Sequence, residues 1–327
     1  MLATMLAMAA ICGPAGATTL ARSDVGRVFV SRGSARGCVR SRSGSWRLGD
    51  ASRVLEARVA GRYALVRRPG EVLSVYDLRE RRRTASAGSF SGSVRFTAIR
   101  FHRSGVAAYA SQDPSGRVEI NTTDGAWGAE GADIDPGFVG LAGSVLAWRR
   151  AGGIEMQDEG LELAPFAQTV LRGRITIEVD HYSELRAHLG NRRPVALGDA
   201  ATPCISSSGC SGVNRIQIAG DHVAARDWQA DPVASQYAGA VTVADLRGRT
   251  RRVTCRSQEV HEYVVTEEGA VACLIDAGEP PSSTQEVRSE NAVLDSGTGI
   301  SALRRLGGEI VWRHDGIERT APLPRRG

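Results

Sequence analysis

The sequence contains no lysine. All 41 basic residues are arginine, against 36 acidic residues, and the formal net charge is +5. Exclusive use of arginine along a whole chain is typical of a GC-rich genome, so the charge by itself indicates no nucleic-acid surface. The densest arginine runs, residues 79–83 and 247–252, each follow an apolar strand, where a solvated loop or edge strand is expected. Aromatic residues are only 5% and do not alternate with these arginines, which argues against base stacking and excludes a nucleic-acid partner.

Long apolar runs are also missing, and no segment reaches the roughly 18 apolar residues that a membrane-spanning helix needs. The longest run, residues 2–12, has no charged side chain before it, but Ala15 and Ala17 follow at the spacing of a signal-peptidase site. We therefore predict a signal peptide over residues 1–17, a mature chain over residues 18–327, and an exported protein. Lipidation of Cys12 is the alternative, although Ile11 is unfavourable immediately before a lipidated cysteine.

Signatures of catalysis and cofactor binding are absent as well. The sequence has no Gly-x-Ser-x-Gly elbow, phosphate-binding loop or dinucleotide fingerprint, and its carboxylates are scattered over different loops. His181 and His188 lack the spacing of a helical zinc site. Asp133 and Asp135 lie in an Asp-x-Asp-Pro-Gly turn that offers too few oxygens for calcium. We predict no catalytic residues, no metal site and no cofactor, and the ligand-binding residues stay unassigned.

The sequence has six cysteines, and cleavage after Ala17 would leave five. In an oxidising compartment they are expected to pair where geometry permits. Cys204 and Cys210 bracket a short loop that folds back easily, and Cys255 with Cys273 is the second candidate disulfide. Cys38 is then left without a partner.

What the sequence does contain is an internal repeat. The run Gly-Val-Ala-Ala-Tyr at residues 105–109 recurs 164 positions later as Gly-Ala-Val-Ala-Cys, and Leu-Gly-Asp-Ala at residues 48–51 recurs at residues 197–200. Six such blocks keep their order in two halves, residues 26–163 and 173–323. Four further blocks complete the set: residues 26–30 with 173–177, 60–64 with 219–223, 75–79 with 243–247, and 143–148 with 307–312.

Each half divides again into units of four short apolar or alternating runs, bounded by glycine, proline or charge. The clearest unit covers residues 55–86. Units of about 40 residues match the blades of a β-propeller, in which sheets stack radially because one sheet cannot bury both faces alone. We predict an all-β fold: a single β-propeller of seven to eight four-stranded blades. Two separate four-bladed propellers are the alternative, but residues 164–172 do not resemble a linker.

The half-repeat segments, Leu-Gly-Asp at residues 48–50, Val-Tyr-Asp-Leu-Arg at 75–79 and Ala-Trp at 147–148, resemble those of exported, uncharacterised propeller-like proteins of GC-rich actinobacteria. The blade layout is more loosely similar to TolB-type and WD40-type propellers, although the Gly-His and Trp-Asp pairs of WD40 blades are missing. This resemblance implies the propeller fold and export, and it implies no defined activity.

Three functions are compatible with these features. The first is a monomeric binding scaffold in the cell envelope or outside the cell, with a protein or cell-envelope glycan as ligand. Its contacts are expected at the blade loops, above all the inserted loops at residues 201–212 and 229–239. The second is a sugar- or peptide-directed hydrolase or lyase that uses the central mouth of the propeller. The third is a structural envelope component.

Overall fold

The computed structural model describes residues 12–14, 16–88, 94–150, 153–158, 168–180, 183–201, 210–231, 236–257, 259–277, 284–289 and 292–322. Within these residues the chain forms thirty β-strands and one short 3-10 helix, Ala51–Arg53. No helix among them has the length and apolar character that crossing a membrane requires. The prediction of an all-β protein is confirmed.

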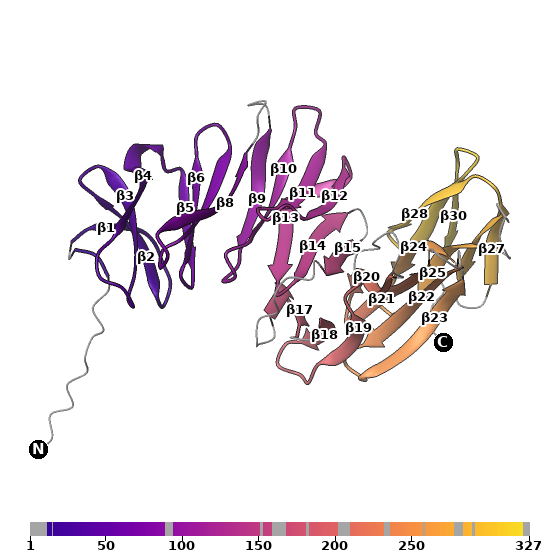
Figure 1. The fold of residues 1–327 in the computed structure, drawn as a ribbon. Coiled ribbons are helices and arrows are strands. Elements are labelled where there is room, and N and C mark those ends of the chain that lie inside the picture. Colours follow the sequence, from indigo (N-terminus) through magenta and orange to yellow (C-terminus); the bar gives the residue numbers. More distant parts are fainter. Residues whose placement is uncertain are drawn as a thin grey trace, which may run out of the picture. The chain divides into compact units, whose positions relative to one another are not determined.

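The strands form consecutive antiparallel sheets of up-and-down order, and the chain divides into two compact units. Figure 1 shows the sheets of the first unit in indigo to purple. The first sheet is β1 (Thr18–Arg22), β2 (Gly26–Ser31), β3 (Ser34–Val39) and β4 (Trp46–Asp50). The second sheet is β5 (Glu56–Ala60), β6 (Tyr63–Arg68), β7 (Val72–Asp77) and β8 (Arg82–Gly88). The third sheet is β9 (Arg95–Phe101), β10 (Ala107–Gln112), β11 (Val118–Thr122) and β12 (Trp127–Gly131).

The fourth sheet begins with β13 (Ile134–Ala142), most of which belongs to the first unit, and continues in the second unit with β14 (Val145–Arg150) and β15 (Gly153–Asp158). The fifth is β16 (Gln168–Leu171), β17 (Ile175–Val179), β18 (Glu184–Leu189) and β19 (Val195–Asp199). The sixth is β20 (Cys210–Ala219), β21 (His222–Asp231), β22 (Gln236–Asp245) and β23 (Thr250–Ser257). The seventh is β24 (Val260–Val265), β25 (Val271–Asp276), β26 (Gln285–Ser289) and β27 (Ala292–Gly297), and the eighth is β28 (Ile300–Leu306), β29 (Glu309–His314) and β30 (Ile317–Pro322).

This succession is that of propeller blades, and it confirms the fold class and the expected blade number. Two details differ from eight separate four-stranded blades. The fourth and eighth sheets each have three strands within the described residues. The outer edge of β15 also pairs with β20, at Ile154 with Ile216 and Glu155 with Arg215. Among the described residues no fourth strand of its own sheet occupies this edge, so its N–H and C=O groups are open to β20. Closure of the blades into one ring stays a prediction.

The repeated blocks adopt the same local structure in both halves. Oδ1 of Asp77 accepts the backbone N–H groups of Arg79 and Glu80 at 2.9 and 3.0 Å. In the second half, Oδ1 of Asp245 accepts those of Arg247 and Gly248 at 2.8 and 3.0 Å. These are Asx turns, in which the carboxylate replaces a backbone acceptor and closes the hairpin.

The hairpin before each Asx turn is also the same in the two halves. Gly61 and Gly220 lie in the turns immediately before β6 and β21 and have φ angles of 55° and 56°. Glycine adopts this left-handed conformation without steric cost. These two turns therefore recur at corresponding positions of the repeated blocks, and the division into two half-repeats stays a prediction.

The hydrophobic core lies between neighbouring sheets. Val28 and Leu48 of the first sheet pack with Ala64 and Leu78 of the second, and Val264 of the seventh packs with Ile310 of the eighth. Trp148 and Trp312 lie in the core and are 5% and 3% exposed. Each indole N–H finds a carboxylate, Glu155 at 2.9 Å and Asp295 at 2.6 Å, as a buried indole requires.

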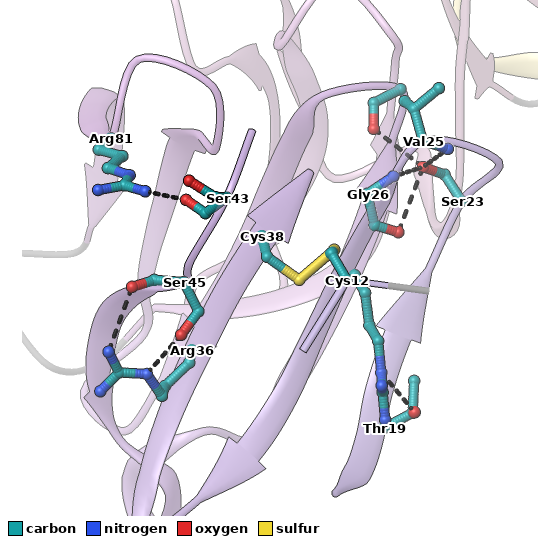
Figure 2. Close-up of a disulfide and its surroundings, with 12 residues drawn as sticks. Cys12, Thr19, Ser23, Val25, Gly26, Arg36, Cys38, Ser43, Ser45 and Arg81 are labelled. Atoms are coloured by element: carbon teal, nitrogen blue, oxygen red, sulfur yellow. Dashed lines mark hydrogen bonds between the residues drawn. A yellow bond between two sulfur atoms is a disulfide. The ribbon is translucent and has the colours of Figure 1, made fainter. Parts of the chain in front are cut away.

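Two disulfides join described residues. Cys255 of β23 is bonded to Cys273 of β25, as predicted, so this bridge links the sixth and seventh sheets. Cys38 is bonded to Cys12, which corrects the expectation of an unpaired Cys38 (Figure 2). The segment around Cys12 lies against the first sheet, since a Cβ at Gly13 would come within 2.8 Å of the Phe29 ring. The predicted Cys204–Cys210 bridge lies outside the described residues, because Cys204 is not among them.

Candidate functional site

The candidate site is a cavity of about 220 Å³ in the first unit. It lies among β5 and β6 of the second sheet, β9 of the third sheet and β13, and polar groups make up most of its lining. The lining residues are Glu56, Arg58, Arg67, Phe96, Thr97, Ala98, Ile99, Arg100, Gly137 and Val139. Three of them are arginines, and one is acidic.

Strand alternation explains why the charged side chains of β5 and β6 meet. Glu56 and Arg58 are two residues apart on β5, so their side chains share one face of the sheet. Arg67 stands directly opposite Glu56 on β6, and paired residues of antiparallel strands also share a face. The second sheet thus presents two guanidinium groups and one carboxylate on the same face.

Two arginines cross from one sheet to the first strand of the next. Nε of Arg58 donates to Oε1 of Glu56 at 2.6 Å, and its Nη1 donates to the backbone carbonyl of Ile99 on β9, also at 2.6 Å. Nε of Arg100 donates to the carbonyl of Val139 on β13 at 3.1 Å. Because these carbonyls lie on strand edges, each guanidinium satisfies an acceptor that the sheet itself leaves unpaired.

Arg67 is the most buried of the three, with 23% of its side chain exposed. Its Nη2 lies 2.9 Å from both carboxylate oxygens of Glu71, and Oε2 of Glu71 also accepts the backbone N–H of Phe96 at 2.9 Å. The guanidinium lies 5.9 Å from the centroid of the Phe96 ring. Nε of Arg67 is buried and has no hydrogen-bond partner in the described structure. A buried donor without an acceptor costs free energy, about 1–3 kcal/mol in protein mutants.

The second half of the chain shows the same position with its donors satisfied. Aligning Gly61 with Gly220 places Arg226 of β21 at the position of Arg67. Nε of Arg226 donates to Oδ1 of Asn214 at 2.9 Å, and its Nη1 donates to the carbonyls of Val260 and His261 at 3.0 and 2.9 Å. Burial lowers the pKa of Arg226, with the neighbouring Tyr263 acting in the opposite direction. The position of Asn214 corresponds in the first half to Leu55, which has no side-chain acceptor.

The region beside Arg226 is a closed polar core. The Tyr263 side chain is buried, and its hydroxyl donates to the carbonyl of Arg215 at 2.9 Å. Burial raises the pKa of this phenol, so it stays protonated and acts as a donor. Nε2 of Gln217 donates to the carbonyl of Tyr263 at 2.5 Å, and Oε1 of the same amide accepts the N–H of Val265 at 3.2 Å. At the position of Arg67, the second half thus supplies from Asn214 the acceptor that the first half lacks.

One cluster of potential metal ligands occurs among the described residues: Glu259, His261 and Asp276, with ligand atoms within 4.8 Å of one another. Nε2 of His261 lies 2.7 Å from Asp276, and Nδ1 lies 3.5 Å from Glu259. Both ring nitrogens therefore face carboxylates already, and these contacts account for the cluster without an ion.

The residues that the sequence analysis considered as metal ligands do not line this cavity. Asp133 and Asp135 lie 3.0 and 3.2 Å from the guanidinium groups of Arg150 and Arg149, which explains the two carboxylates as ion-pair partners. His188 Nε2 lies 2.9 Å from Glu178. His181 is outside the described residues, as are residues 202–209 and 232–235 of the two inserted loops.

Sequence reasoning missed the cavity arginines. They are single residues on three strands, in a chain where arginine is the only strong base. The one available signal was the difference between the half-repeats at Leu55 and Asn214.

No protein-family model matches the chain, and no curated protein matches it in sequence. Among solved structures, Hsv2 of Kluyveromyces marxianus matches with 8% identity over 86% of this chain and 99% of its own, at a TM-score of 0.32. BamB from Moraxella catarrhalis has 13% identity over 92% and 83% of the two chains, at 0.26. The computationally designed protein Ika8 has 11% identity over 95% and 98%, at 0.29. At these scores the likeness carries no argument about function, and the fold assignment rests on the strands themselves.

Proposed function

We propose that this protein is an exported binding scaffold, whose propeller-type blades hold a ligand in the cavity between the second and third sheets. Export is supported by the apolar leader-like segment, the resemblance to exported propeller-like proteins of actinobacteria, and the bridge between Cys255 and Cys273. In that compartment the ligands at hand are cell-envelope polymers and extracellular proteins, and we favour an envelope glycan.

The observation that carries the proposal is a polar cavity lined by three arginines, one of which, Arg67, has a buried Nε without a hydrogen-bond partner in the described structure. Buried donors are satisfied in most native structures, and an exception calls for a specific explanation. A ligand acceptor supplies one: the Arg67 side chain would turn toward the cavity on binding, and its Nε, which is buried in the free protein, would then be satisfied in the bound state. The counterpart Arg226 has protein acceptors instead, so at this repeat position the unmet donor occurs in the first half and not in the second.

The cavity does not favour the hydrolase alternative. Glu56 is the one carboxylate of its lining, and it is held by Arg58 at 2.6 Å. General acid-base catalysis on a glycosidic bond uses two carboxylates on opposite sides of the bond. No second carboxylate of this lining is available for that role.

The proposal is tested by sedimenting the full chain with purified cell-envelope polysaccharide and with peptidoglycan, at low and physiological salt. Saturable co-sedimentation supports a binding scaffold. A full chain that sediments with no envelope fraction, and whose thermal midpoint no soluble fragment of these polymers shifts, contradicts it. A ligand present at about 100 times its dissociation constant adds about 2.7 kcal/mol to stability, so binding at the site is measurable as a thermal shift.

A further inference from the structure

We infer that the group bound in this cavity is the carboxylate of a sugar acid. The inference rests on the proposed function and narrows it to a ligand class. It starts from charge: three arginines and one glutamate line the cavity, which leaves an excess of positive charge. Glu71, which holds Arg67 from one side, does not line it.

The donors that remain available define the chemistry. Arg58 uses Nε and Nη1, and Arg100 uses Nε, for contacts within the protein. Their other guanidinium N–H groups form no hydrogen bond in the described structure, and the buried Nε of Arg67 forms none there either. Guanidinium N–H groups form a fixed planar fork that matches the two oxygens of a carboxylate.

The second half shows which atom the first half lacks. At the position of Leu55 it carries Asn214, whose Oδ1 lies 2.9 Å from Nε of Arg226. The missing partner of Arg67 is therefore an sp² oxygen. A carboxylate supplies such an oxygen together with the negative charge that the arginines call for.

Size and polarity select a sugar. Drug-sized ligands occupy pockets of about 300–1,000 Å³, whereas this cavity is about 220 Å³, so it takes one ring-sized group and not a longer segment. The polar lining, with the Thr97 side chain and strand-edge backbone groups, suits hydroxyls better than the apolar side chain of a peptide terminus.

The test measures binding of D-glucuronate to the full chain by calorimetry, beside D-glucose, acetate, inorganic phosphate and the dipeptide Ala-Ala. We expect glucuronate to bind more tightly than all four, with an affinity that falls as salt is added. If D-glucose binds as tightly as D-glucuronate, the ligand does not need a negative charge and the inference is overturned. Tighter binding of phosphate overturns the sugar-acid assignment in favour of a phosphate ligand, and tighter binding of the dipeptide overturns it in favour of a peptide carboxylate. In each of these cases the scaffold proposal stands, whereas envelope fractions that fail to bind at all would remove the proposal itself.

Variants locate the site. Arg100→Gln, an exposed change that the fold should tolerate, is expected to weaken glucuronate binding at least about tenfold through the loss of a charged hydrogen bond. Arg95→Gln is the matched control, because Arg95 is exposed on the same strand but does not line the cavity. Equal effects of the two variants, or none from Arg100→Gln, would place the ligand elsewhere.

The final variant copies the second half into the first. Leu55→Asn introduces the acceptor that Asn214 provides, at a residue that is 59% exposed and whose N–H donates to the Arg67 carbonyl at 2.9 Å. We expect it to weaken glucuronate binding several-fold without lowering the thermal midpoint, because the new amide oxygen competes for Nε of Arg67. An unchanged affinity would overturn the role of Nε as a ligand donor.

Discussion

The ring of Tyr63 lies directly against Gly105: a Cβ placed on this glycine would come within 2.8 Å of Cδ1 of the tyrosine. The contact joins the second sheet to the turn between β9 and β10 of the third. The second half repeats it with His222 and Gly269, where a Cβ would come within 2.5 Å of the imidazole. The same contact, a ring of one sheet packed on a glycine of the next, thus occurs in both halves of the chain.

This joint predicts a steric penalty at Gly105. Gly105→Ala adds a methyl group at φ +90°, which costs about 1–2 kcal/mol for any L-residue. The clash with Tyr63 adds about 1–3 kcal/mol of overpacking. Urea unfolding should therefore show a clearly larger loss than backbone strain alone explains.

Gly116→Ala is the matched control for that experiment, since Gly116 has φ +89° and nothing within 4 Å of the added Cβ. We expect it to lose only the backbone term. Tyr63→Ala combined with Gly105→Ala should restore part of the additional loss. Equal losses for the two alanine variants would mean that the Tyr63 ring moves aside freely.

The bridge between Cys255 and Cys273 predicts a redox-dependent stability. The two residues are 18 positions apart, and closing a loop of this length contributes about 3 kcal/mol on the chain-entropy estimate. The double variant Cys255→Ala, Cys273→Ala should lose that amount in oxidising buffer. In reducing buffer its midpoint should approach that of the unaltered protein, and a gap that persists there would assign the loss to packing at these two buried positions.

The Cys12–Cys38 bridge leads to a prediction about the leader. Arg27 donates from Nη2 to the Ala17 carbonyl at 2.6 Å and from Nε to Thr19 Oγ1 at 2.9 Å, so residues on both sides of the expected cleavage site contact the first sheet. A chain that begins at Thr18 loses the bridge and one of these bonds. We expect it to be less stable than the full chain by about 3 kcal/mol, with the Cys38 thiol open to maleimide after unfolding.

Cys12→Ser in the full chain separates the bridge from the rest of the segment. If the Thr18 chain, the serine variant and the full chain unfold together, the bridge contributes nothing to the first sheet. N-terminal sequencing of the exported protein then decides between the two forms, because a chain that begins at Thr18 carries no Cys12.

Much of the fold could be predicted because repeats are local. Asp77 and Asp245, or Gly61 and Gly220, sit in turns whose residues are adjacent in sequence, so a short block determines the hairpin and its recurrence marks the blade. The edge pairing of β15 with β20 could not be found this way, since it joins strands separated by a whole sheet and depends on which edge is left unpaired. The partner of Cys38 was missed because Cys12 was assigned to the leader.

The cavity was beyond sequence reasoning for a different reason. Arg58, Arg67 and Arg100 become neighbours only because Glu56 pairs with Arg67 across two strands and β9 lies beside β5. What these arginines can bind depends on which of their N–H groups lack a protein acceptor, and only the distances between atoms in the folded chain show this. An arginine bound by carbonyls and an arginine with a buried free Nε look identical in sequence.

Asp295 of β27 predicts how stability depends on pH in the last two sheets. Its side chain is 7% exposed and accepts hydrogen bonds from Trp312 at 2.6 Å and from Nδ1 of His314 at 3.0 Å, while Arg319 lies 2.9 Å away. Burial alone raises the pKa of this carboxyl, but the bonds from Trp312 and His314, together with the positive charges of His314 and Arg319, outweigh burial and hold the pKa below its usual value. The ionised form is therefore the one that the fold stabilises.

For a carboxyl whose pKa is lower in the folded state, the added stability is complete above the unfolded pKa of about 3.9 and is lost as the pH falls through the folded value. Asp295→Asn should lose about 2–3 kcal/mol at pH 7, because it removes the charge from three hydrogen bonds. Urea midpoints measured from pH 7 to pH 3 should show this loss shrinking once the pH falls below the unfolded pKa of about 3.9, because the unfolded carboxyl takes up its proton before the native one does. Asp315→Asn, at a side chain that is 76% exposed beside the same histidine, is the control and should change the midpoint little at any pH. A loss that is independent of pH would mean that Asp295 acts through its shape and not through its charge.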